Sequence, residues 1–133
     1  MAENKNLLLK ISLILFAIMA LGYGIIYLFF PMLQIKAAGG ELIPPGWIRW
    51  MGGILIALGI GAVMVYKNPV KQKIFVFSMA IGTLLNGLTL LYTLLFEGEG
   101  IGNISNTLIP AIILLILSAM LWISLKQSKE ILQ

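Results

Sequence analysis

The only arginine of the chain lies where an aromatic cluster meets a long apolar run, and it is the first candidate for chemistry. Arg49 stands between Trp47 and Trp50. A guanidinium group offers a planar fork of donors, so Arg49 could contact the phosphate of a lipid headgroup or the carboxylate of an anionic ligand. The alternative is a snorkelling interface residue that packs on tryptophan. A further alternative is that its charge pairs with one of the acidic residues Glu41, Glu97 and Glu99.

Two tyrosines lie on one face of the preceding apolar run. Tyr23 and Tyr27 are four residues apart, which places them one above the other on a helix. Together with Arg49 and Trp50 they could line an outward-facing pocket for a flat apolar ligand such as a quinone. Tyr92 falls near the same depth of a later run. Aromatic stripes at this spacing also arise from ordinary packing, so the sequence leaves both interpretations open.

Asn86 is the most polar residue in the middle of any apolar run. An amide in hydrocarbon needs a hydrogen-bond partner, and an interhelical bond of this kind contributes about 0.6–2 kcal/mol. Structural bonding between helices is one interpretation of Asn86. A ligand or permeation site is the other, because polar groups inside a membrane often mark functional positions.

Several kinds of chemistry lack the residues they need. The chain has no cysteine, histidine or aspartate, so we expect no metal site, no cofactor and no histidine-based catalytic triad. Residues 11–30, 51–65, 75–95 and 109–124 contain no ionisable Asp, Glu, Lys, Arg or His either. Proton-coupled transport and general acid–base catalysis both need a titrating group near the reacting atoms. We therefore expect no catalytic residues and a protein that is not an enzyme.

The elements that position these residues are long apolar runs. The chain is 60% hydrophobic and 11% charged, whereas soluble domains carry about 25% charged residues. About 20 apolar residues in a helix cross a bilayer core of roughly 30 Å. The sequence therefore predicts a single all-α transmembrane domain over residues 1–133, an antiparallel up-down-up-down bundle of four helices. We expect these helices at about residues 7–30, 49–66, 74–96 and 108–125.

The connections carry three further expectations. Pro31 ends the first helix, and the loop over residues 32–48 lies in the headgroup layer. Thr107 caps the fourth helix, with Pro110 tolerated in its first turn. The tail after Leu125 leaves the membrane.

Orientation follows from the distribution of basic residues. Two of them, Lys36 and Arg49, fall on one side of this topology. Seven fall on the other: Lys5, Lys10, Lys67, Lys71, Lys73, Lys126 and Lys129. Basic residues favour the cytoplasmic side, so both termini should be cytoplasmic in a multi-pass protein of the cell membrane, in a bacterium the inner membrane. These residues form no basic face or motif for nucleic acid.

Small residues recur at intervals of four along three of the runs. Gly53, Ala57 and Gly61 form such a set in the second run. Faces of this type let two helix backbones approach closely in lipid. Gly24 in the first run and Gly82 with Asn86 in the third continue the pattern. The spacing predicts helix packing, either within the bundle or onto another subunit.

Residues 21–31, Leu-Gly-Tyr-Gly-Ile-Ile-Tyr-Leu-Phe-Phe-Pro, and residues 49–61, Arg-Trp-Met-Gly-Gly-Ile-Leu-Ile-Ala-Leu-Gly-Ile-Gly, resemble segments of small DoxX-like bacterial membrane proteins. The resemblance implies a four-helix bundle, in a family that is often of unknown function. Some relatives are companions of membrane oxidoreductases. The arginine that recurs in such proteins would correspond here to Arg49.

Two functional hypotheses follow. The first is a non-catalytic accessory or structural subunit of a membrane complex, which associates with other membrane subunits or with itself. The second is a binder or carrier of a lipid-like or quinone-like ligand at the mouth formed by Arg49, Trp50, Tyr23 and Tyr27. An uncoupled pore would need a continuous polar path, which Asn86 and the threonines of one helix do not supply alone.

Overall fold

The computed structural model describes residues 6–37, 39, 45–97 and 104–133, and this part of the chain is helical with no strand. Four of its helices are long and apolar enough to cross a membrane. Two short helices, α3 (Pro31–Ala37) and α7 (Lys129–Leu132), accompany them. The four long helices are α2 (Leu7–Phe29), α4 (Gly46–Lys67), α5 (Lys73–Phe96) and α6 (Ile104–Gln127).

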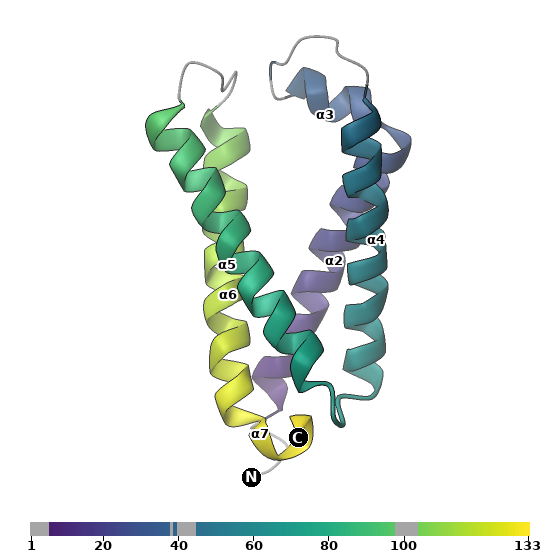
Figure 1. Cartoon of the computed structure of the whole chain (residues 1–133), viewed down its shortest axis with the longest axis vertical. Coiled ribbons are helices and arrows are strands. Elements are labelled where there is room, and N and C mark those ends of the chain that lie inside the picture. The colour runs from purple at the N-terminus through teal and green to yellow at the C-terminus, as the bar shows by residue number, and fades with distance from the viewer. Residues whose placement is uncertain (1–5, 38, 40–44, 98–103) are drawn as a thin grey trace.

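The long helices form two antiparallel hairpins that meet at one end. Helix α2 packs mainly on α4, and α5 packs mainly on α6, while α2 and α6 make the principal contact between the hairpins. Figure 1 shows the hairpins converging near α7 and diverging toward the opposite end. The convergent end carries the lysines of the Lys67–Lys73 turn and of the C-terminal segment, and the divergent end carries α3. The predicted four-helix, up-and-down arrangement is therefore present, in a form that is open at one end.

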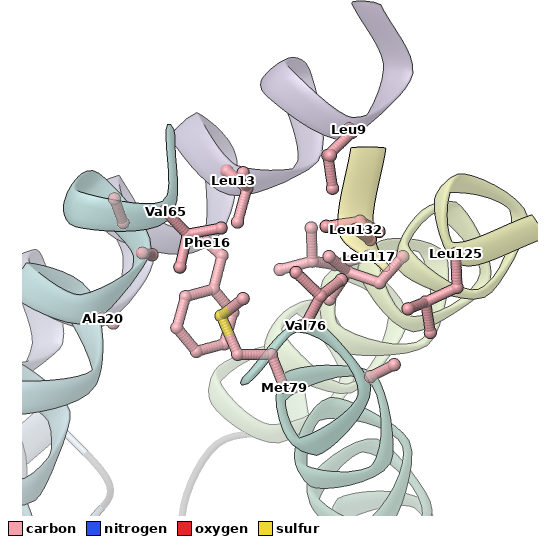
Figure 2. Close-up of a cluster of buried hydrophobic side chains, with 14 residues drawn as sticks. Leu9, Leu13, Phe16, Ala20, Val65, Val76, Met79, Leu117, Leu125 and Leu132 are labelled. Atoms are coloured by element: carbon pink, nitrogen blue, oxygen red, sulfur yellow. The ribbon is translucent and has the colours of Figure 1, made fainter. Parts of the chain in front are cut away.

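The hydrophobic core occupies the convergent end. Figure 2 shows one buried cluster with side chains from all four long helices and from α7. Its largest fully buried members include Leu9, Leu13, Leu121, Leu132 and Val76. A single cluster at one end explains why the hairpins stay together there. Its labelled residues are Leu9, Leu13, Phe16, Ala20, Val65, Val76, Met79, Leu117, Leu125 and Leu132.

The C-terminal segment contributes to this core, and the expectation that it leaves the membrane stays a prediction. Leu132 of α7 is only 1% exposed. The backbone N–H of Lys71, which has a positive φ of 60°, donates to the carbonyl of Ile131 at 3.2 Å. The turn between the hairpins and the C-terminal segment are therefore joined beneath the core.

Glycines set the close approach of α2 and α4, with a register that differs from the predicted one. A Cβ on Gly52 would lie 2.6 Å from the backbone nitrogen of Leu28, and one on Gly24 would lie 3.0 Å from that of Ile56. A Cβ on Gly59 would lie 2.7 Å from the side chain of Leu21 and 3.2 Å from its backbone nitrogen. Gly52 and Gly59 are seven residues apart, so they stay on one helix face.

The predicted Gly53–Ala57–Gly61 set contributes only its last member to the bundle. A spacing of four advances about 40° around a helix at each step, so the three residues spread away from any one neighbour. Gly61 meets the ring of Phe75, Ala57 is exposed, and a Cβ on Gly53 would meet nothing within 4 Å. Their packing onto another subunit stays a prediction.

Two boundaries also differ from those expected. Helix α6 begins at Ile104, so Thr107 lies inside it and Pro110 follows its first turn. Pro31 and residues 32–37 of the expected loop form α3, which buries Pro31 and Ile35. Burial of these apolar groups stabilises a short helix that local sequence preference does not indicate.

Candidate ligand site between the hairpins

The tyrosines of α2 continue the face that forms the core. A separation of seven residues is close to two helical turns, or about 10 Å along the axis, and returns to nearly the same face. Tyr23 lies seven residues beyond Phe16, and Tyr27 lies seven beyond Ala20, and both starting residues are in the core. The tyrosine rings are half-buried and meet edge to face, with centroids 5.8 Å apart. The pair therefore lies beyond the last packed layer, and Tyr27 also borders α4, because a Cβ on Gly52 would lie 3.0 Å from the Cβ of Tyr27.

Helix α5 presents polar residues on its corresponding face. Asn86 lies seven residues beyond Met79, another core residue, and Thr93 lies seven beyond Asn86. Gly82 lies seven residues beyond Phe75, whose ring contacts Gly61 of α4, and a Cβ on Gly82 would meet nothing within 4 Å. This face of α5 is thus directed toward the first hairpin but has no partner there.

Helices α4 and α6 complete the site with apolar residues. Ile54 lies seven residues before Gly61, and Trp50 lies eleven before it, close to three turns. On α6, Leu114 and Pro110 lie seven residues before the core residues Leu121 and Leu117. We call these surfaces the open faces: Tyr23, Tyr27, Trp50, Ile54, Gly82, Asn86, Thr93, Pro110 and Leu114.

The side chain of Asn86 has no hydrogen-bond partner among the described residues, and the same is true of the side chains of Thr89 and Thr93 on this helix. Thr83 donates to the carbonyl of Met79 at 2.8 Å, and Ser118 donates to that of Ala80 at 3.0 Å. Asn86 is exposed and makes no hydrogen bond within the described part of the chain. Bonding between these helices through Asn86 was one of the two interpretations, and the described residues provide no partner for it.

The open faces carry hydrogen-bonding groups without charge. The phenols of Tyr23 and Tyr27, the amide of Asn86 and the hydroxyl of Thr93 can each donate and accept. The first ionisable side chain beyond them on α5 is Glu97, directly after the helix ends. This arrangement suits a neutral polar group attached to an apolar body.

A hydrogen bond between two described residues links the hairpins at the divergent end. The side-chain amide of Asn106, in the first turn of α6, donates to the carbonyl oxygen of Ala37, the last residue of α3. Along the helices, the open faces lie between the core and this hydrogen bond.

Arg49 makes no hydrogen bond with Tyr23 or Tyr27 in the described part of the chain. Arg49 precedes Trp50, so it lies about 100° away around α4 from the open face. It is exposed, and it makes no ion pair with Glu97 or any other described residue. Its other two expected partners, Glu41 and Glu99, lie outside the described residues, as does Lys5 of the basic side.

Two further features lie apart from the open faces. Tyr92 is 56% exposed and its ring pairs with Phe96, at a centroid distance of 4.9 Å. A half-open apolar groove of about 220 Å³ lies between α2 and α4 toward the convergent end. It is lined by Leu13, Ile14, Ala17, Ile18, Leu21, Val63 and Tyr66. Within the described ranges, no group of three His, Cys, Asp or Glu residues is placed to hold a metal ion.

Sequence reasoning singled out four members of the open faces, Tyr23, Tyr27, Trp50 and Asn86, and treated Gly82 as a packing residue. It noted Thr93 only as a polar neighbour of Asn86 and Pro110 only as part of a helix start, and it missed Ile54 and Leu114. The signal that connects them is the spacing of seven between these residues and the core, which becomes visible only when the core is known.

Comparison with protein-family models, with curated proteins and with solved structures finds no match to this chain. The DoxX-like resemblance therefore stays a prediction that depends on residues 21–31 and 49–61.

Proposed function

We propose that this multi-pass membrane protein is non-catalytic and binds a lipid-like or quinone-like molecule between its two hairpins. The observation that carries the proposal is Asn86, an amide within a membrane span that has no hydrogen-bond partner in the described chain. An unsatisfied amide in an apolar environment costs roughly 1–3 kcal/mol. A bound molecule with a carbonyl or hydroxyl group would remove this cost.

The open faces favour a flat or elongated ligand with a neutral polar group. Tyr23, Tyr27 and Trp50 offer aromatic surface, and Ile54 and Leu114 offer aliphatic surface. Aromatic and apolar walls with a few polar groups are typical of small-molecule sites. Because the open faces carry no charged side chain, the ligand's polar group is expected to be an ester, hydroxyl or quinone carbonyl.

The test is mass spectrometry of molecules extracted from protein purified in mild detergent. The unmodified protein should retain a specific apolar compound, and the double variant Tyr23→Phe/Asn86→Leu should lose most of it. Tyr92→Phe removes a phenol of the same kind outside the open faces, so it should retain the compound. If the unmodified protein carries only bulk lipid, or if both variants retain the compound equally, the proposal is wrong.

A second candidate function is an accessory subunit of a membrane complex. It is favoured by α4, where Gly53 and Ala57 leave bare backbone on a surface that no described helix of the chain covers. Such surfaces suit close packing by another transmembrane helix. Gly53→Leu should then abolish co-purification of a partner subunit or of a second copy. A stable monomer that purifies alone would argue against this function.

We further infer that the convergent end faces the cytoplasm, which would place both termini there. The support is the distribution of basic residues, seven against two. The DoxX-like likeness of residues 21–31 and 49–61 favours a bacterial protein and hence the inner membrane. In this proposal Arg49 lies at the outer interface, where it contacts lipid headgroups.

A further inference from the structure

An aromatic pair joins α5 and α6 near the convergent end. The rings of Phe77 and Trp122 meet edge to face, with centroids 5.3 Å apart and an interplanar angle of 81°. Phe77 is 42% exposed and Trp122 is half-buried. The pair is therefore accessible from the outside of this hairpin. It also packs against the core through Trp122.

Each aromatic residue has a lysine one helical turn closer to the membrane surface. Lys73 is the first residue of α5 and precedes Phe77 by four positions. Lys126 is in the last turn of α6 and follows Trp122 by four positions. Residues four apart share a helix face. Because side chains lean toward the N-terminus of their helix, Phe77 leans toward the turn of Lys73 and Lys126 leans toward Trp122.

We propose that Lys73, Phe77, Trp122 and Lys126 form a binding site for an anionic phospholipid, distinct from the open faces. The two ammonium groups would hold the headgroup phosphate, while the aromatic pair packs against the glycerol and the upper acyl chains. Both lysines lie at ends of apolar helices, which is the depth of the headgroups in a bilayer. Tryptophan is enriched at the same depth.

The surrounding charge favours an anion at this position. The turn and the C-terminal segment bring Lys67, Lys71 and Lys129 to the same end, and all three are exposed. Glu130 is the one acidic residue in the described segments 67–73 and 126–133. The hydrogen bond from Lys71 to the carbonyl of Ile131 joins these two segments. Clustered lysines next to transmembrane helices are typical of anionic-lipid recognition.

The aromatic pair argues for a phospholipid instead of a soluble anion. A free phosphate needs only the two ammonium groups and gains nothing from the rings of Phe77 and Trp122. A phospholipid uses both parts of the surface, because its chains continue along the apolar flank of the α5–α6 hairpin. Helix α6 exposes hydrocarbon below the pair, as Ile116 shows.

Quenching of Trp122 by lipids with brominated acyl chains tests this site directly. The variant Trp47→Phe/Trp50→Phe leaves Trp122 as the single tryptophan. It is reconstituted in phosphatidylcholine vesicles, and brominated phosphatidylglycerol or brominated phosphatidylcholine is titrated in. We expect stronger quenching by the anionic lipid, with a preference of roughly five-fold for each lysine. Excess inorganic phosphate should leave the preference unchanged.

Matched lysine variants separate a defined site from general surface charge. In the single-tryptophan background, Lys73→Gln/Lys126→Gln should lose the preference, while Lys73→Arg/Lys126→Arg should keep it. Lys67→Gln/Lys71→Gln removes the same amount of charge from the same end, and this variant should keep most of the preference for the anionic lipid. Circular dichroism checks that each variant is folded. If the double variant does not fold, Lys73→Gln alone should still reduce the preference for the anionic lipid by about five-fold.

Three outcomes would overturn the proposal. The first is that the single-tryptophan protein with all its lysines shows no preference for the anionic lipid. The second is an equal loss in the two Lys→Gln pairs, which would assign the effect to general surface charge. The third is displacement by inorganic phosphate, which would replace the phospholipid by a soluble anion.

Discussion

Two neighbouring glycines of α4 have opposite surroundings, and this makes the helix register testable at a single residue. A Cβ on Gly52 would lie 2.6 Å from the nitrogen of Leu28 and 2.9 Å from the oxygen of Gly24, and both are backbone atoms that cannot rotate away. Gly52→Ala is therefore expected to lower the free energy of unfolding by about 1–3 kcal/mol. Gly53→Ala should instead leave it unchanged or raise it by up to about 1 kcal/mol, because its site is open and alanine is favoured over glycine inside a helix. Unfolding in detergent, followed by circular dichroism, measures both.

A third glycine calibrates this comparison. A Cβ on Gly87 would lie 2.8 Å from the side chain of Leu115, which can change rotamer, so Gly87→Ala should fall between the other two variants. If Gly52→Ala and Gly53→Ala had equal effects, the register of α2 on α4 described above would be wrong.

Residue types alone identified part of the candidate site. Tyr23, Tyr27 and Asn86 are recognisable because polar groups are rare in apolar spans and each needs a partner. Arg49 was grouped with them because it is near Trp50 in sequence and near the tyrosines in expected depth. Depth does not specify direction, and the rotation of about 100° per residue takes Arg49 off the face of Trp50.

At the scale of the elements, one side-chain hydrogen bond ties α5 to α6. Ser118 donates to the carbonyl of Ala80 at 3.0 Å, whereas Ser124 donates to Met120 of its own helix at 2.7 Å. Ser118→Ala should therefore cost about 0.5–1.5 kcal/mol of unfolding free energy. Ser124 is equally buried, but Ser124→Ala should lower the unfolding free energy by less, because the hydrogen bond of Ser124 stays within its own helix. The same detergent unfolding measurement distinguishes them, and a larger effect at Ser124 would contradict this role of Ser118.

The long helices could be predicted from the sequence and the short ones could not. The four spans follow from apolar length, which dominates any other signal in a chain with 11% charged residues. Helices α3 and α7 depend on tertiary burial of Ile35 and Leu132. The start of α6 at Ile104 was missed because Thr107 and Pro110 together resemble an N-terminal signal.

At the scale of the whole molecule, the angle between the hairpins had no signal in the sequence. Lipid is as apolar as a leucine side chain, so exposed hydrophobic residues are as acceptable beside lipid as beside a helix. The core at the convergent end and the open faces at the other therefore look alike in composition. Only polar groups such as Asn86 and Thr93 distinguish a face that awaits a partner from one that faces lipid.

The orientation of the molecule is the last testable consequence, and it depends on charge alone. The chain has no cysteine, so a single introduced cysteine reports on one position. Asn68, in the lysine-rich turn, and Lys36, in α3, are exposed at opposite ends. With seven basic residues on the side of Asn68 and two on that of Lys36, a membrane-impermeant maleimide should label Lys36→Cys in intact cells. It should label Asn68→Cys only after the membrane is opened, and the reverse pattern would place the convergent end outside, where the proposed phospholipid site would meet the other leaflet.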